Sequence, residues 1–383
     1  MKLNIISNHI RNFINLYPNQ NIINISPLCK NIIEHFLNEI KNAETNWKNV
    51  KNSISNTFND IQTMEYSNSE LFNLIPEKIQ NHISTTFFYL KTFIFFINKR
   101  KIIVTIGSSK KDNNYLLDCL KLIYIWLYIS TKYSDANCSQ EINIYLYLTN
   151  HVKEKEDNIT LSAIHANTAY THVCSQKTEI FIFREEEWFK VFIHETFHNL
   201  GFDFSSLNIK IAQKKLLKHF IIESKFELYE TYNETWATFI NLIFVSYFSK
   251  KINNFENLLN SEIIFSLYQC YKIFQHYNLS YDDLFQNKKQ HFIEDTNIFC
   301  YYVLKSIMIF YINDFLKWCN DYNGENIIMF NKTQQNIIDF TNFIIKLSEK
   351  YEFIKELNNI ERYVKNNKPN IIVRKTMRMT VFG

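Results

Sequence analysis

The segment 192–201 reads Phe-Ile-His-Glu-Thr-Phe-His-Asn-Leu-Gly and places His194, Glu195 and His198 in a His-Glu-x-x-His pattern within an apolar stretch. Chance predicts only about 0.02 such patterns in a chain of this composition. On an α-helix, residues four apart lie one above the other, so both imidazoles can face the same metal ion. The spacing therefore predicts a helix that carries two zinc ligands, His194 and His198.

Glu195 lies about 100° round such a helix from His194, beside a bound ion rather than on it. A carboxylate in that place can accept a proton from a zinc-bound water, so Glu195 is the expected general base. Three glutamates at 185–187 supply negative charge where a helix N-terminus favours it, and Gly201 supplies the stop at the other end. The alternative is a core helix whose histidines are only hydrogen-bonded or exposed.

Glycine and proline are rare, with four of each among 383 residues, whereas aromatic residues make up 16%. This composition favours long helices and strands over a turn-rich sandwich or a disordered chain. The length exceeds the roughly 250–300 residues that one hydrophobic core usually serves, so we expect more than one lobe. A net charge of +4 is too balanced to indicate nucleic-acid binding.

The seven cysteines are odd in number and form no Cys-x-x-Cys pair, which is typical of proteins in a reducing compartment. The N-terminus shows no apolar run followed by small residues, so we expect no secretory signal. Apolar runs such as 122–128 are far shorter than the roughly 20 residues of a membrane span. We therefore expect a soluble intracellular protein.

Hydrophobic periodicity divides the chain into four regions. Residues 1–80 predict an N-terminal helical accessory region, and residues 206–365 predict a helical subdomain with helices at 221–248, 260–277, 293–319 and 332–365. Residues 81–205 contain the His-Glu-x-x-His helix, and residues 366–383 form a basic tail that we expect to be solvated.

Within 81–205 the pattern predicts a hairpin over 85–108 with a solvated basic turn at 98–101, a helix from about 113 to 130, and strands near 142–148 and 179–183. The order of these elements predicts an α+β fold, in which a small twisted mixed sheet backs the metal helix and a mainly α-helical lobe follows.

Two protein ligands are too few for a catalytic zinc ion, which normally has three and a water. Asp203 follows His198 by five residues and could be the third, although the serines at 205 and 206 favour a turn or a helix cap. A resemblance to the metzincins would require a histidine at position 204, where this chain has Phe204. Glutamates on the following helices remain.

The segment 229–238 resembles the third-ligand helix of the gluzincins, the zinc peptidases that include thermolysin-like and neprilysin-like enzymes. In that helix an asparagine precedes the glutamate ligand and a small residue follows it three positions later, as Asn233, Glu234 and Ala237 do here. The resemblance implies a zincin-like core and one zinc ion per chain, held by the two histidines and Glu234. It also implies hydrolysis of polypeptide substrates, with the glutamate of the motif as base.

One position departs from that family's pattern. Those enzymes usually carry an aspartate four residues after the ligand, hydrogen-bonded to a zinc histidine, and here that position is Thr238. Glu230 lies one turn before Glu234 on the same helical face. It could orient a histidine, or it could be the ligand itself with Glu234 behind it.

Substrate binding and the oxyanion have candidates of their own. The resemblance implies that an extended peptide lies along an edge strand before the metal helix, and Asn167, Ala169 and Tyr170 stand in a segment similar to the marker of that strand. A plain loop is the alternative. Three residues near the ligand helix in sequence are candidates for stabilising the oxyanion, namely Tyr229, Tyr232 and His219.

The Asn/Ile-rich composition and the core segment 194–205 are also similar to uncharacterised metalloprotease-like proteins encoded by large DNA viruses of eukaryotes. That resemblance implies a protein of the host cytoplasm or the virion. Two other functions stay open. One is a zinc-binding but catalytically inactive scaffold or interaction protein, against which Glu195 argues. The other is a nucleic-acid or virion scaffold that binds through the basic tail.

Overall fold

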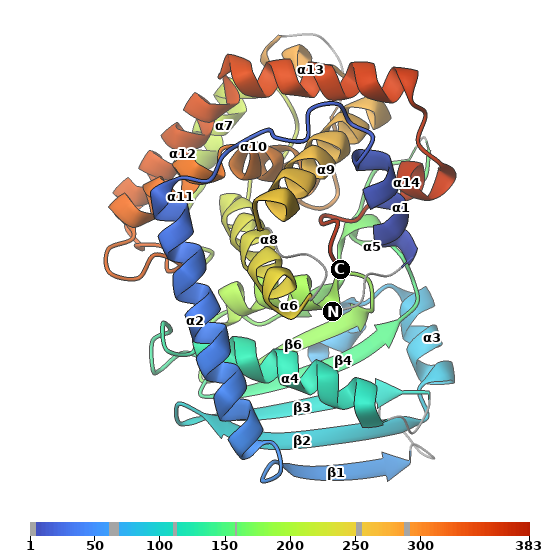
Figure 1. The fold of residues 1–383 in the computed structure, drawn as a ribbon, viewed down its shortest axis with the longest axis vertical. Helices are drawn as coiled ribbons and strands as arrows, with labels where there is room; N and C mark the ends of the chain where they lie inside the picture. The colour runs from blue at the N-terminus through green and yellow to red at the C-terminus, as the bar shows by residue number, and fades with distance from the viewer. Residues whose placement is uncertain (1–4, 61–68, 110–112, 158, 250–254, 287–291) are drawn as a thin grey trace. The chain divides into compact units, whose positions relative to one another are not determined.

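The computed structural model describes residues 5–60, 69–109, 113–157, 159–249, 255–286 and 292–383. Among these residues it contains helices α1 to α14 and one six-stranded sheet, so the predicted α+β class is confirmed (Figure 1). Contacts between Cα atoms divide the chain into two compact units. The sheet unit consists of Ile33–Val152 and Asn167–Phe202, and the helical unit consists of Met1–Ile32, Lys153–Ala166 and Asp203–Gly383.

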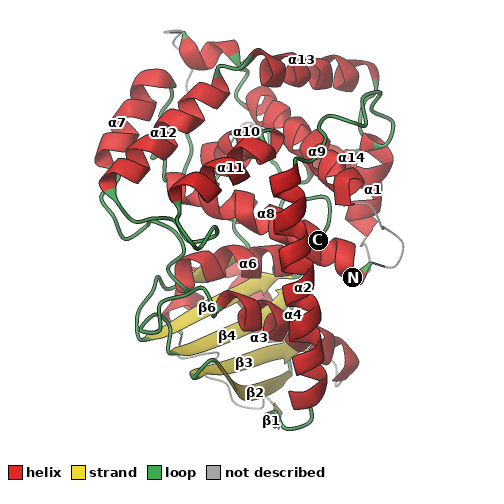
Figure 2. Cartoon of the chain, turned by 60° about the vertical axis from the view of Figure 1, so that its left-hand side comes forward, coloured by secondary structure: helices red, strands yellow, loops and turns green. Residues whose placement is uncertain are grey.

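The sheet has the strand order β1-β2-β3-β4-β6-β5, and Figures 1 and 2 label its strands from β1 to β6 without β5. Its strands are β1 (Ser55–Asp60), β2 (Tyr89–Ile97), β3 (Arg100–Ser108), β4 (Glu141–Thr149), β5 (Ala169–Thr171) and β6 (Lys177–Arg184). The pairings of β3 with β4 and of β4 with β6 are parallel, and the other three are antiparallel. Helix α4 (Asn113–Ser130) connects β3 to β4, because parallel neighbours need a crossover.

The hairpin of β2 and β3 is confirmed, but its basic turn is not wholly solvated. Asn98 and Lys99 both have positive φ, at 47° and 68°, as a two-residue hairpin turn of type I′ requires. Arg100 is only 4% exposed, and its guanidinium donates to the carbonyl oxygens of Thr131, Asp135 and others in the loop after α4. These carbonyl groups replace the water that the guanidinium loses on burial.

Both faces of the central strands are covered. Tyr147, Phe181 and Phe183 share one face, where they pack against the 3₁₀ turn η1 (Glu70–Leu74) and helix α3 (Glu77–Thr86). Ile180 and Ile182 alternate with them on the opposite face and are fully buried as well. This double burial explains why the strand near 179–183 reads as a continuous apolar run.

The N-terminal region is only partly helical. Helices α1 (Ile5–Ile14), α2 (Pro27–Val50) and α3 agree with the helical prediction for residues 1–80. The prediction is wrong for Ser55–Asp60, which forms β1 and pairs antiparallel with β2. This short polar segment has no apolar alternation that would reveal a strand, and its main-chain pairing with β2 fixes its conformation.

The helical unit contains most of the remaining helices: α5 (Ala163–Ala166), α7 (Lys210–His219), α8 (Leu228–Phe248), α9 (Phe255–His276), the π-turn η3 (Phe299–Leu304), α10 (Lys305–Phe310), α11 (Ile312–Tyr322), α12 (Gln334–Ser348), α13 (Tyr351–Asn366) and α14 (Ile371–Lys375). The predicted helix over 332–365 is therefore two helices with a break at 349–350. Among the described residues no single helix is long and apolar enough to cross a bilayer. Only the segments 299–310 and 312–322, bent by 90° against each other, pass that test together.

The last residues of the chain are buried, so the prediction of a solvated tail is wrong for 376–382. Arg378, Thr380 and Val381 have no exposed surface. Side chains of α9 and α10 bind the main chain of this segment: Lys305 donates to the Met379 carbonyl at 2.8 Å, and Glu262 accepts from the Val381 amide at 3.0 Å. Lys305 and Glu262 are themselves paired at 3.2 Å. The polar groups are thus satisfied inside the unit rather than by water.

Candidate metal centre

The His-Glu-x-x-His segment is helical, as its spacing predicts. It lies in α6 (Trp188–Asn199), and Gly201 follows with φ 68°, the left-handed conformation of a helix stop. The rings of His194 and His198 have their centroids 5.2 Å apart, so the two imidazoles are neighbours on one face. Both histidines and Glu195 are at most 9% exposed.

The opposite side of α6 is anchored to α4. Trp126 donates from its indole nitrogen to the Thr196 hydroxyl at 2.6 Å, and its ring stacks on Phe197 at 6.5 Å. At about 100° per residue, Thr196 lies roughly 180° from the midline between the two histidines, and Phe197 lies roughly 80° from it. Because one side of α6 is held by α4, the imidazoles are left facing away from that helix.

Asn199 fixes the end of α6 to the sheet. Its side-chain nitrogen donates to the Thr171 hydroxyl at 3.2 Å, and its side-chain oxygen accepts from Thr178 at 3.2 Å. Its main-chain carbonyl accepts from the Ser139 hydroxyl at 2.6 Å. Asn199, Thr196 and Trp126 were not among the residues predicted to form the site. The only signal was the position of Asn199 directly after the motif, and the partners come from three other segments.

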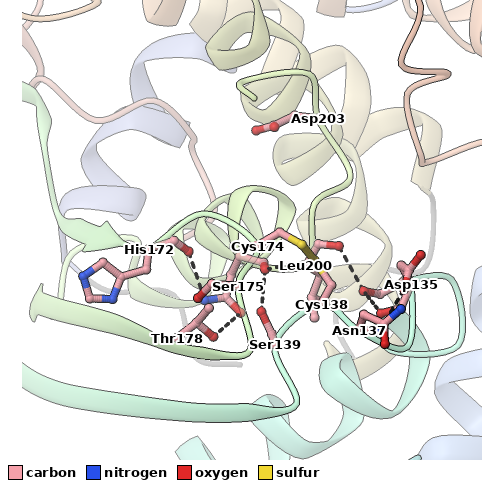
Figure 3. The surroundings of a disulfide bond; sticks show 12 residues. Asp135, Asn137, Cys138, Ser139, His172, Cys174, Ser175, Thr178, Leu200 and Asp203 are labelled. Carbon is pink, nitrogen blue, oxygen red and sulfur yellow. Dashed lines mark hydrogen bonds between the residues drawn. A yellow bond between two sulfur atoms is a disulfide. The ribbon is translucent and has the colours of Figure 1, made fainter. Parts of the chain in front are cut away.

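A disulfide lies beside this helix end. Cys138 and Cys174 are joined, next to Leu200 (Figure 3). The Cys174 amide donates to the carbonyl oxygen of His198 at 3.3 Å, so the bridged loop contacts the backbone of a motif histidine. The expectation of reduced cysteines is wrong for this pair, since no spacing rule reveals two partners 36 residues apart. The other five cysteines are free and buried.

An acidic residue joins the two histidines as the third candidate ligand. His194, His198 and Glu230 are all buried and each offers one ligand atom, and these atoms lie within 4.8 Å of one another. The group includes Glu230, the alternative of the sequence analysis, and does not include the preferred Glu234. Glu234 lies one turn further along α8 and is 1% exposed.

Two imidazoles and one carboxylate match the donor set of catalytic zinc sites. Tetrahedral ligands about 2.1 Å from an ion lie roughly 3.4 Å from each other. The residue types fit such an ion, and the ligand atoms, which lie within 4.8 Å of one another, would have to move closer together to hold it. A buried group of this kind can bind a metal ion, and its chemistry does not fix which one.

Asp203 forms a turn, as the more conservative interpretation predicted. One of its carboxylate oxygens accepts from the amide and hydroxyl of Ser205, at 3.0 and 2.7 Å, and the other accepts from the Asn233 side chain at 2.6 Å. Asp203 thereby ties the segment after α6 to the start of α8. It is not part of the group that could hold a metal ion.

The three oxyanion candidates have different surroundings. The Tyr232 hydroxyl is fully buried and donates to the Ile328 carbonyl at 3.0 Å. His219 has its Nε2 atom 2.9 Å from the Ser348 hydroxyl. Tyr229 lies near Glu230: burial raises the pKa of Tyr229, and the negative charges of Glu227 and Glu230 raise this pKa further. Of the three, Tyr229 is the one that interacts with the acidic residues at the start of α8, and its hydroxyl is hydrogen-bonded to Glu227.

The segment proposed for substrate binding is an edge strand. Ala169 and Tyr170 belong to β5, whose neighbour within the described sheet is β6 alone. Asn167 precedes the strand and is hydrogen-bonded to Tyr170. Burial raises the pKa of Tyr170, and the charge of Glu195 raises this pKa as well, which places Tyr170 within electrostatic reach of Glu195.

No other strand among the described residues pairs with β5 on the side away from β6. The Thr168 carbonyl accepts from Phe183, and the His172 amide donates to Glu179, each at 3.0 Å. Bonding residues alternate along an antiparallel pair, so the amide and carbonyl groups of Ala169 and Thr171 point away from β6. An extended chain could pair with them there.

Comparison with models of known protein families, with curated proteins and with solved structures finds no match to this chain.

Proposed function

We propose that the protein is a zinc-dependent peptidase in which His194, His198 and Glu230 hold the ion and Glu195 is the general base. One observation carries the proposal: a buried group of two imidazoles and one carboxylate next to the glutamate of a His-Glu-x-x-His helix. A purely structural zinc site has no use for that glutamate. The His-Glu-x-x-His pattern supports the same reaction class, whereas the gluzincin-like match of Asn233 and Ala237 applies to Glu234 as ligand and not to Glu230.

A zinc ion held by these residues would lower the pKa of a bound water towards about 7 and would polarise a carbonyl group. Glu195 then accepts a proton from the attacking water and passes it to the leaving amine. Tyr229 is the preferred donor to the oxyanion, because it is within electrostatic reach of the ligand Glu230. Its hydroxyl is hydrogen-bonded to Glu227 and would exchange this partner for the oxyanion.

The substrate is an extended polypeptide that pairs with β5. Ala169 and Thr171 direct their main-chain groups away from β6, and Tyr170 lies within electrostatic reach of the general base. Main-chain pairing holds a peptide with little dependence on its sequence. The side-chain preference of the enzyme must therefore come from other residues.

Metal analysis of purified protein tests the ligand set. We expect about one zinc ion per chain in the wild type, loss of this zinc in Glu230→Ala, and bound zinc of lower affinity in Glu234→Ala, because a residue that orients a ligand changes metal affinity by about 10–100-fold. The two variants are matched, since both remove a buried glutamate from α8. Full zinc in Glu230→Ala, with loss in Glu234→Ala, would reverse the assignment.

Cleavage of a broad peptide library tests the activity. Glu195→Gln should abolish cleavage while zinc stays bound, because it removes the base and leaves the proposed ligands. Ala169→Pro should weaken substrate binding by removing an outward amide from β5. A wild-type protein that binds zinc but cleaves no library peptide would instead be an inactive scaffold.

A further inference from the structure

A second site lies in the helical unit, in a cavity of about 480 Å³. It is lined by α9, by the link between α13 and α14, by the end of α14 and by residues 155–157. Ligand sites for small molecules commonly have volumes of about 300–1,000 Å³. The cavity therefore has the size of a small-molecule site, and its lining belongs to one compact unit.

The lining is strongly basic. Five cationic side chains surround the cavity, namely Lys155, Lys272, Lys368, Arg374 and Lys375, together with His276. One carboxylate, Asp157, lines it as well and is paired with Lys155. The remaining four cations give a local excess of positive charge that the balanced net charge of the chain conceals.

Three of these cations form no ion pair within 4.0 Å in the described part of the chain: Lys368, Arg374 and Lys375. Arg374 nevertheless acts on Asp157, whose pKa is lowered by the hydrogen bond from Lys155 and also by the charge of Arg374. Lys365, by contrast, is paired with Glu361 at 2.8 Å one turn earlier. Like charges around one concave surface repel each other, and the walls of a cavity screen them less than open water does. An anionic ligand would relieve this repulsion.

The backbone that carries the cations is fixed. The Lys155 amide donates to the Lys375 carbonyl at 2.7 Å, and the Tyr268 hydroxyl donates to the Val373 carbonyl at 3.2 Å. Lys272 is only 5% exposed and donates to the Thr376 carbonyl, with its ammonium group 5.2 Å from the Tyr268 ring centre. A site whose backbone is already ordered loses less entropy when a ligand binds.

We propose that this cavity binds a small molecule with two phosphate groups. Arg374 offers a planar fork that matches phosphate oxygens, and Lys368 and Lys375 offer point charges on flexible stems. Two phosphates distribute their negative charge across the cations of the lining, whereas one phosphate reaches only part of them. The tyrosines at 268 and 271 supply an apolar wall for the body of the ligand. This site is independent of the proposed metal centre.

Calorimetric titration of the full chain tests the proposal. The probes are fructose 1,6-bisphosphate and ADP, with fructose 6-phosphate and fructose as probes of lower charge. We expect one molecule of a probe with two phosphates, here called a diphosphate, to bind per chain. Fructose 6-phosphate should bind at least about tenfold more weakly, and fructose should not bind. A preference for ADP over the sugar bisphosphate would identify a nucleotide as the natural type of ligand, and the opposite preference would identify a sugar phosphate.

Charge variants give the matched control. Lys368→Gln and Arg374→Gln should each weaken diphosphate binding by about tenfold, because each removes a charge-assisted contact. Lys365→Gln removes the same charge one turn away and should change the affinity less than twofold. All three side chains are exposed, so the variants should fold, which circular dichroism checks.

Two results would overturn the site. One is the absence of saturable binding of either diphosphate up to about 10 mM. The other is equal weakening by Lys365→Gln and Arg374→Gln, which would show a diffuse charge effect rather than a built site. Tighter binding of duplex DNA than of both diphosphates, lost equally in these variants, would likewise overturn it in favour of a nucleic-acid surface.

Discussion

Glu294 is a partly buried carboxylic acid whose titration should be visible in the stability of the protein. Desolvation by burial raises its pKa from 4.5 to about 7, although hydrogen bonds from Ser224 and from the Phe299 amide at 2.7 Å favour the charged form. The negative charge of Glu227 raises this pKa further. Glu294 therefore keeps its proton in the folded chain at a pH where it loses it in the unfolded chain.

The sign and size of the effect follow from that difference. Below pH 4.5 the carboxyl group is protonated in the folded and the unfolded chain, so its titration does not change the free energy of unfolding. Between pH 4.5 and about 7 only the unfolded chain releases the proton, so the free energy of unfolding falls by about 1.4 kcal/mol per pH unit. Over this window the loss reaches about 3 kcal/mol at most, and it stays constant at higher pH.

Urea unfolding of Glu294→Gln measures this loss, because glutamine resembles the protonated acid at every pH. We expect the variant to gain about 2–3 kcal/mol relative to the wild type between pH 5 and pH 7.5. Both proteins should be metal-free, so that metal release at low pH does not contribute. Glu325→Gln, which removes an exposed carboxylate, is the control for loss of charge. A stability difference between Glu294→Gln and the wild type that does not change with pH would refute the reasoning.

Three further predictions concern stability. Replacing Cys138 and Cys174 by serine should lower the free energy of unfolding by up to about 4 kcal/mol, because the bridge closes a loop over 36 residues of sequence. Dithiothreitol should destabilise the wild type and leave this variant unchanged; equal responses would contradict the bridge. Phe382→Ala should cost about 3–5 kcal/mol, since Phe382 is 1% exposed, whereas Phe96→Ala, at a site 68% exposed, should cost under about 0.5 kcal/mol in the same urea series. Lys99→Gly should stabilise the protein by about 0.5–1 kcal/mol, because Lys99 holds φ 68° in the hairpin turn; a lower urea midpoint would contradict the turn type.

The elements with a strong local pattern could be predicted from the sequence. The metal helix was placed because apolar periodicity, a motif of fixed spacing and a stop at Gly201 all agree, and α6 begins and ends close to the expected limits. The central strands were found for the same reason. In contrast, β1 contains few apolar residues and becomes a strand only through its pairing with β2.

Local sequence patterns do not predict contacts between residues that are far apart in the chain. The burial of 376–382 depends on Glu262 and Lys305, more than 70 residues away, and a basic composition gave the opposite prediction. Trp126 holds α6 from a distance of 70 residues. The cations at 368, 374 and 375 belong to the segment predicted as a basic tail, and Lys155 and Lys272, which complete the cavity, come from other segments.

The choice between Glu230 and Glu234 as the third ligand decides which residue stands one helical turn after that ligand. With Glu234 as ligand, the residue four positions later is Thr238. This threonine is buried, and its hydroxyl has no hydrogen-bond partner among the described residues. A threonine there cannot provide the carboxylate that gluzincin-like enzymes place behind a zinc histidine. With Glu230 as ligand, the residue four positions later is Glu234, a buried carboxylate on the same helical face. An acidic residue then stands four positions after the ligand, but the asparagine before the ligand and the small residue three positions after it are replaced by Tyr229 and Asn233. This register predicts that Glu234→Asp keeps zinc binding better than Glu230→Asp, since a supporting carboxylate tolerates a shorter side chain through water more readily than a direct ligand does.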